Sequence, residues 1–189
     1  MLTFDPTCHK YYWNGEDVPG ITHILNTVGL TDLTWVKQDA LERGTDVHAA
    51  TQLYDEGTLD DGSITDEIRP YLNAYKEFIQ VVEWVPIVRE QPKYSERYGF
   101  AGTLDGIYKT DKGGYAILEI KSTDGPEQES WKIQTAAQQE LWRAEYPGAL
   151  RYSLQLKSDG NFKMRGPYAS VEDWLDFQSA LRIYRRIQK

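Results

Sequence analysis

Two short stretches decide the fold: Gly102-Thr103-Leu104-Asp105-Gly106-Ile107 and Ala116-Ile117-Leu118-Glu119-Ile120-Lys121-Ser122. Both are predicted to be strands, because apolar residues recur at alternate positions. The segment 109–114 between them contains two adjacent glycines, which suit a hairpin turn. The sequence therefore predicts an antiparallel hairpin in which each strand carries one acid inside an apolar run.

The two acids of this hairpin, Asp105 and Glu119, predict a cation site. An ionised carboxylate on a buried strand is costly unless a cation compensates it. Glu119 and Lys121 must face the same side of the sheet, since side chains alternate with a period of two. Asp105 comes opposite them if the hairpin register allows it. Paired carboxylates beside an ammonium suit Mg²⁺-assisted attack of water on a phosphodiester.

The spacing of these residues resembles a known motif. Asp105, thirteen further residues and then Glu119-Ile120-Lys121 resemble the motif of the PD-(D/E)XK nuclease superfamily. The surrounding residues resemble its RecB-like and lambda-type phage exonuclease branch, over roughly residues 20–145. The resemblance implies an α/β fold with a central mixed β-sheet of about five strands flanked by helices, the restriction-endonuclease-like core.

The length predicts one domain over 1–189, and the resemblance implies that it is a nuclease domain. It would comprise an N-terminal β-element (1–19), the nuclease core (20–145) and C-terminal strands with a helix (146–189). We expect Thr34 to cap a helix that runs through Tyr54, with Trp35, Val36, Leu41, Val47 and Leu53 on its apolar face. Gly44 indicates a break or close packing in that helix. The acidic stretch 55–67 predicts a solvated loop, and Ser170 predicts the cap of the last helix, with Asp173 completing an imperfect capping box.

Three further groups are metal-ligand candidates beside Asp105 and Glu119. The resemblance implies that His48, within Gly44-Thr45-Asp46-Val47-His48, brings an imidazole to the metal. The alternative is a half-buried histidine with a backbone partner. The resemblance also implies a glutamate near the metals ahead of the hairpin, and Glu90 is either this residue or a surface acid of an edge strand. With the carbonyl of Ile120, these residues would hold one or two Mg²⁺ or Mn²⁺ ions, since hard oxygens with one imidazole suit those ions better than Zn²⁺.

Two glutamines follow the hairpin on one predicted helix face. The resemblance implies a Gln-x-x-x-Tyr pair that positions active-site groups and DNA, and Gln134 fits its first position, whereas Gln138 stands where the tyrosine would be. Ordinary helix surface is the alternative for both. Lys121 would orient or deprotonate the attacking water and contact DNA.

Composition limits the classes of protein that fit. The hydrophobic content of 40% argues against disorder. A single cysteine, Cys8, excludes an internal disulfide and a cysteine-ligated iron–sulfur cluster. The net charge of −8 argues against a simple nucleic-acid binder, although residues 150–189 alone carry +4. Without a membrane-length apolar run or a signal pattern, we expect a cytoplasmic protein, in the host cytoplasm if phage-encoded.

The resemblance implies a metal-dependent exonuclease that acts on the ends of linear double-stranded DNA, in phage or bacterial recombination or repair. An endonuclease of restriction or junction-resolving type is the nearest alternative. A nuclease-like module that only binds DNA or a protein is a second alternative. A glycosidase that works with two carboxylates is a third, but it would leave Lys121 and His48 without roles. A homo-oligomer or a recombination protein as partner also belongs to what the resemblance implies.

Overall fold

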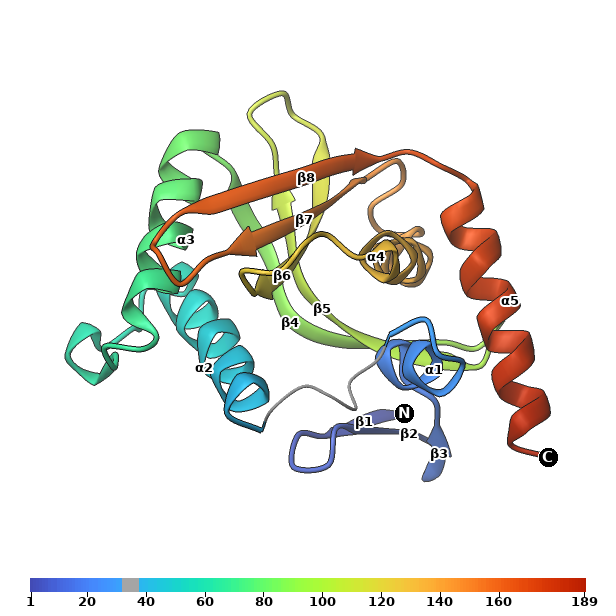
Figure 1. Ribbon diagram of the computed structural model, residues 1–189. Coiled ribbons are helices and arrows are strands. Elements are labelled where there is room, and N and C mark those ends of the chain that lie inside the picture. Colours follow the sequence, from blue (N-terminus) through green and yellow to red (C-terminus); the bar gives the residue numbers. More distant parts are fainter. Residues whose placement is uncertain (32–37) are drawn as a thin grey trace.

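The computed structural model describes residues 1–31 and 38–189, and the strands described form two sheets (Figure 1). The strands are β1 (Leu2–Asp5), β2 (Lys10–Trp13), β3 (Glu16–Val18), β4 (Val85–Ser95), β5 (Phe100–Lys109), β6 (Tyr115–Ser122), β7 (Leu150–Leu156) and β8 (Phe162–Tyr168). The helices are α1 (Ile21–Thr27), α2 (Gln38–Asp55), α3 (Arg69–Val82), α4 (Glu129–Trp142) and α5 (Glu172–Ile187), with a 3-10 turn at Asp61–Ser63. No described helix is long and apolar enough to cross a membrane.

The larger sheet has the order β4-β5-β6-β7-β8 and is mixed. β4, β5 and β6 form an antiparallel meander, β6 pairs with β7 in parallel, and β8 returns antiparallel to β7. A parallel pair needs a crossover connection, and α4 provides it between β6 and β7. The predicted α/β fold with a central mixed sheet of five strands flanked by helices is confirmed.

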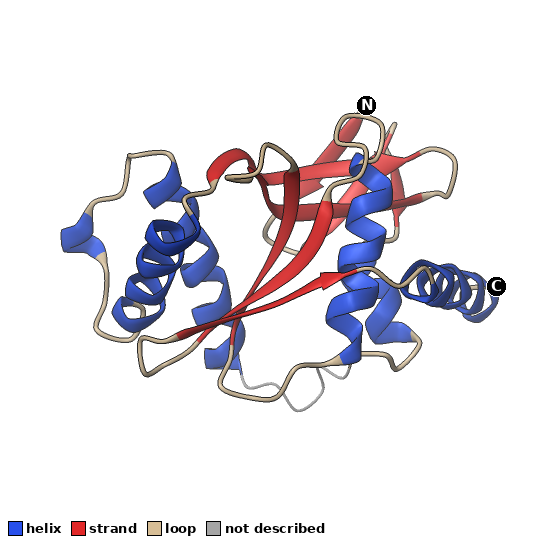
Figure 2. Cartoon of the chain, turned by 90° about the horizontal axis from the view of Figure 1, so that it is seen from above, coloured by secondary structure: helices blue, strands red, loops and turns tan. Residues whose placement is uncertain are grey.

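Helices cover both faces of this sheet (Figures 1 and 2). One apolar cluster joins α2 and α3 to the sheet through residues such as Ala50, Tyr75 and Leu118. The other joins α1, α4 and α5 to the sheet through residues such as Ile117 and Phe177. Consecutive residues of β6 enter different clusters, because side chains of a strand point alternately to the two faces.

Helix α2 differs in part from its prediction. Thr34, Trp35 and Val36 lie outside the described residues. The helix continues through Gly44 without a break, and Leu41 and Leu53 are exposed rather than turned toward the core. Only a narrow strip around Val47 and Ala50 is buried. Beside this strip, α2 contacts the sheet through polar side chains: His48 lies against Glu90, and the Thr51 hydroxyl accepts from Arg89.

Two buried acids differ from their predictions. Asp55, in the predicted solvated stretch, has a side chain that is 3% exposed and paired with Arg89. Asp173 does not complete the predicted capping box, because its carboxylate instead accepts a hydrogen bond at 2.8 Å from the guanidinium of buried Arg151. Val171 is the N-cap residue of α5, and the Ser170 hydroxyl accepts a hydrogen bond from the Glu172 amide.

Candidate metal centre

The two acids of the hairpin lie side by side at the centre of the larger sheet. Gly106 pairs with Leu118, so Asp105 and Glu119 each stand one residue further along the antiparallel ladder. The backbone amide of Ile120 donates to Asp105 Oδ2 at 2.6 Å. Both acids are buried, with 6% and 3% exposure. The register of the hairpin therefore places Asp105 opposite Glu119, as the predicted cation site requires.

A histidine and a second acid join Asp105 from two other elements. His48 Nδ1, on α2, lies 3.2 Å from Glu90 Oε1, on β4, and 3.5 Å from Asp105 Oδ1, on β5. One donor atom from each of the three residues lies within 4.8 Å of the other two. An imidazole and two carboxylates at this separation could hold a divalent cation between them. His48 is thus bonded to side chains, whereas the alternative interpretation gave it a backbone partner.

Glu90 reaches this cluster from a backbone conformation that L-residues rarely adopt. Its φ is +43°, although it stands in the middle of β4. The neighbouring pairs, Arg89 with Gly106 and Gln91 with Leu104, place it opposite Asp105. Such strain costs about 1–3 kcal/mol and gathers at functional sites. The strained backbone thus supports a functional task for the Glu90 carboxylate.

This strain can be measured with two variants that both remove the Glu90 carboxylate. Glycine adopts a positive φ freely, whereas alanine pays the steric cost, so Glu90→Gly should be about 1 kcal/mol more stable than Glu90→Ala. Urea unfolding of the two proteins gives the difference. Equal stability of the two variants would show that the backbone at Glu90 is unstrained.

Negative charge is crowded in the centre. Burial and the neighbouring charge of Glu119 raise the pKa of Asp105, against the opposing effects of His48 and Lys121. Burial alone would lower the pKa of His48, but the charges of Asp105 and Glu90 and the hydrogen bond to Glu90 raise it to about 9. The crowded carboxylates thus favour positive charge among them. A donor set that takes up positive charge in this way fits a hard divalent metal ion.

Glu119 is separate from this three-residue cluster and is held by three donors. Its Oε1 accepts from Lys121 Nζ at 2.8 Å and from Gln134 Nε2 at 2.6 Å. Its Oε2 accepts from Gln138 Nε2 at 2.5 Å. Lys121 Nζ also donates to Gln134 Oε1 at 3.0 Å, so lysine, glutamate and glutamine form a closed ring of hydrogen bonds. The structure therefore brings the predicted residues together in two adjoining groups.

Gln138 is buried, contrary to the interpretation as ordinary helix surface. It is 1% exposed, and its amide nitrogen is directed at Glu119 and, at 3.4 Å, at the carbonyl of Thr103. It is therefore neither helix surface nor open to DNA, because the face of α4 that carries it packs directly on β5 and β6. Its function in the fold is to position Glu119. Gln134, one turn earlier, is only partly buried.

A buried ion pair between Arg89 and Asp55 lies next to the centre and contacts the strand that carries Asp105. Arg89 Nε lies 2.9 Å from Asp55 Oδ2, and its guanidinium also donates to the Thr51 hydroxyl at 2.9 Å and to the backbone carbonyl of Asp105. The Tyr75 hydroxyl donates to Asp55 at 2.5 Å. Arg89 thus fixes the strand position of Asp105. Sequence reasoning missed both partners, since Asp55 begins an acidic stretch and Arg89 has no local pattern.

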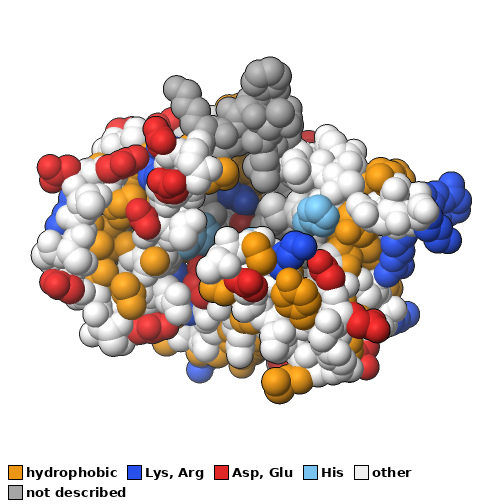
Figure 3. All heavy atoms as spheres, turned by 90° about the horizontal axis from the view of Figure 1, so that it is seen from below, with side chains coloured by type: hydrophobic (Ala, Val, Ile, Leu, Met, Phe, Trp, Pro, Cys, Tyr) orange, Lys and Arg blue, Asp and Glu red, His pale blue; other side chains and the backbone are white. Residues whose placement is uncertain are grey.

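Part of the centre reaches the molecular surface. Figure 3 shows a hollow of that surface in which acidic, basic and histidine side chains gather. The exposed fractions agree: 26% of the His48 side chain, 21% of Glu90 and 23% of Lys121. These groups are therefore within reach of a ligand.

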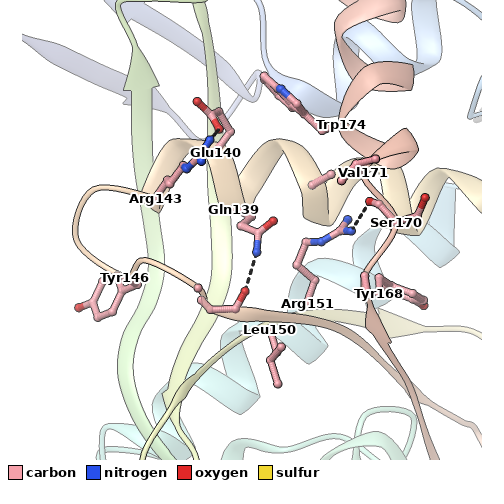
Figure 4. A pocket seen from close by; sticks show the side chains of 14 residues that line it. Gln139, Glu140, Arg143, Tyr146, Leu150, Arg151, Tyr168, Ser170, Val171 and Trp174 are labelled. Atoms are coloured by element: carbon pink, nitrogen blue, oxygen red, sulfur yellow. Dashed lines mark hydrogen bonds and ion pairs between the residues drawn. The ribbon is translucent and has the colours of Figure 1, made fainter.

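A second cavity, of about 380 Å³, lies between α4, β7 and the start of α5 (Figure 4). None of the predicted site residues lines it. Its buried guanidinium, that of Arg151, donates to the carbonyls of Lys132 and Ser170 and pairs with Asp173. These donors are consequently engaged within the protein, and the cavity offers no comparable chemistry.

Comparisons with known proteins give distant structural likenesses. No family model matches the sequence, and no curated protein matches it. The crystal structure of SSO0001 is 16% identical and covers 89% of this chain and 87% of its own, with a TM-score of 0.43. A candidate exonuclease from Eubacterium rectale is 15% identical and covers 87% of this chain and 69% of its own, with a TM-score of 0.47. Both TM-scores are below 0.5, so these likenesses do not indicate a function, and the function is inferred from the site itself.

Proposed function

We propose that this protein is a metal-dependent nuclease of the PD-(D/E)XK type that hydrolyses phosphodiester bonds at DNA ends. The observation that carries the proposal is the His48–Glu90–Asp105 cluster, set on the hairpin that also presents Glu119 and Lys121. Mg²⁺ or Mn²⁺ is the proposed cofactor, held by these three residues, with Glu119 and the Ile120 carbonyl as further ligands. A bound divalent ion would activate water and neutralise charge on the scissile phosphate.

The charge of the centre favours this function over metal-free phosphate binding. Three carboxylates face one imidazole and one ammonium, so a phosphate would be repelled unless a cation were present. Lys121 is the residue that we propose to orient the attacking water and to contact the substrate. Its ammonium is partly exposed and is fixed by Glu119 and Gln134. A contact between Gln134 and DNA is part of the same proposal.

DNA as the substrate, the preference for ends and a part in recombination or repair come from the motif resemblance. The decisive experiment compares end-labelled linear DNA with closed circular DNA, in Mg²⁺, Mn²⁺ or EDTA. Metal-dependent loss of the linear substrate alone is the expected result. Cutting of the circle would favour an endonuclease instead, and failure to cut either substrate would favour a module that only binds.

Lys121→Ala should separate the chemical step from binding. Lys121 contacts Glu119 and Gln134 and lies beside the metal cluster, so its loss should lower the cleavage rate by about 10²–10⁴-fold. DNA affinity should change far less than the cleavage rate, because the Lys121 ammonium is already paired with Glu119. Single-turnover cleavage and fluorescence anisotropy measure the two quantities. Unaltered cleavage would remove Lys121 from the mechanism.

A further inference from the structure

The N-terminal hairpin places a second histidine near the metal centre. His9 stands at the turn between β1 and β2, with its ring centroid 5.1 Å from Phe4 and 5.8 Å from Tyr11. Its backbone has a φ of +51°, in the left-handed region. The residue as a whole is exposed, although its imidazole makes edge-to-face contacts with the stacked rings of Phe4 and Tyr11. The His9 side chain therefore contacts neighbouring rings and remains accessible to a ligand.

Tyr11 joins this hairpin to the strand that carries Asp105. Its hydroxyl lies 2.9 Å from Thr103 Oγ1, and Thr103 precedes Asp105 by two residues, so both point to the same face of β5. Tyr11 is 2% exposed and packs against Gly20, where any Cβ would come within 2.7 Å of its ring. The hairpin is thus fixed beside the centre.

The imidazole of His9 has unused hydrogen-bonding capacity. Nε2 lies 3.5 Å from the Tyr11 hydroxyl, and within residues 1–31 and 38–189 no partner contacts Nδ1. Burial against the aromatic rings lowers the pKa of His9, while the nearby charge of Glu90 raises it to a lesser extent. The effect of the Glu90 charge on this pKa agrees with the contact of Tyr11 with Thr103, which brings the hairpin close to the centre. His9 thus has a ring nitrogen that can donate to a ligand at the edge of an acidic centre.

We propose that His9 is a substrate-binding residue that donates a hydrogen bond to a backbone phosphate of the nucleic acid, adjacent to the phosphate at the metal centre. The inference rests on the proposed function and extends it to the N-terminal hairpin, which Tyr11 joins to the strand of Asp105. Phosphate is the chemistry that His9 fits, because a ring N–H on an accessible side chain can donate to an anionic oxygen. Among the described residues, His9 is not a member of the metal-binding cluster.

The test uses three variants with DNA binding and steady-state cleavage as readouts. His9→Gly removes the donor without backbone strain, because glycine tolerates the positive φ. His9→Asn keeps an N–H donor in the same backbone conformation. His23→Ala is the control, since His23 is an exposed histidine on α1 whose ring contacts Tyr184. Anisotropy in Ca²⁺ gives the Kd for a labelled duplex.

His9→Gly should raise Kd and KM by about tenfold, the effect expected for one hydrogen bond to a charged group, with kcat unchanged. His9→Asn should recover part of the loss, and His23→Ala should match wild type. Unaltered Kd and KM in His9→Gly, in a protein whose wild type cleaves DNA, would overturn this inference alone. A wild type that neither binds nor cleaves DNA would overturn the proposed function and the inference together.

Discussion

Asp105→Asn should abolish metal-dependent DNA cleavage, with a loss of at least about a thousandfold. Asp105 is the acid that touches both halves of the centre: it faces His48 at 3.5 Å and accepts the Ile120 amide at 2.6 Å. Removing its charge takes away a ligand of the cation, whose stabilisation of the transition state amounts to several kcal/mol. Cleavage of linear DNA at saturating Mg²⁺ measures the loss.

The fold should survive this substitution. The pKa of Asp105 is raised by burial and by Glu119, so its ionised form is disfavoured in the native state. A neutral asparagine can still accept the Ile120 amide, and the metal-free variant should unfold at or above the wild-type temperature. Asp46→Asn, on the exposed side of α2, is the matched control and should cleave normally. Cleavage by Asp105→Asn within threefold of wild type would disprove its place as a ligand.

Asp55→Asn should have the largest effect on stability, a decrease of about 3–5 kcal/mol in the free energy of unfolding. It would leave the Arg89 guanidinium, with a side chain only 6% exposed, without its counter-charge. Urea unfolding measures the change. Asp61→Asn is the control, because Asp61 is 61% exposed and its pair with Arg69 should contribute less than about 1 kcal/mol.

A double variant separates stability from positioning. Asp55→Leu with Arg89→Met removes both charges, and apolar replacement of a buried pair is often neutral or stabilising. Stability should recover relative to Asp55→Asn, whereas cleavage should remain low, because Arg89 no longer donates to the backbone carbonyl of Asp105. Wild-type cleavage by this double variant would show that Arg89 serves the fold alone.

The hairpin and its acids could be predicted from the sequence because their pattern is local. Alternation over 102–107 and 116–122 specifies both strands, and the glycines at 113–114 specify the turn. Once the register is known, the positions of Asp105 and Glu119 follow from the period of two. The spacing of His48 after Gly44 added the residue from α2, although the helical apolar stripe drawn there was only partly right.

The remaining features depend on contacts between segments far apart in the chain. The pairing of Asp55 with Arg89, the burial of Gln138 and the contact of Tyr11 with Thr103 each join two distant elements. The positive φ of Glu90 has no signal in its residue type, because such a conformation in a strand favours glycine. Tertiary packing, rather than local propensity, determined these features.

The most direct measurement is a calorimetric Mn²⁺ titration of the wild-type protein at pH 7, in two buffers of different ionisation enthalpy. We predict saturable binding with net proton release, because the raised pKa of His48, about 9, and that of Asp105 leave protons for the metal to displace. Affinity should therefore weaken as the pH falls. Binding should vanish in Asp105→Asn and persist in Asp46→Asn. Absence of Mn²⁺ binding by the wild type, or equal binding by Asp105→Asn, would contradict a metal centre at His48, Glu90 and Asp105.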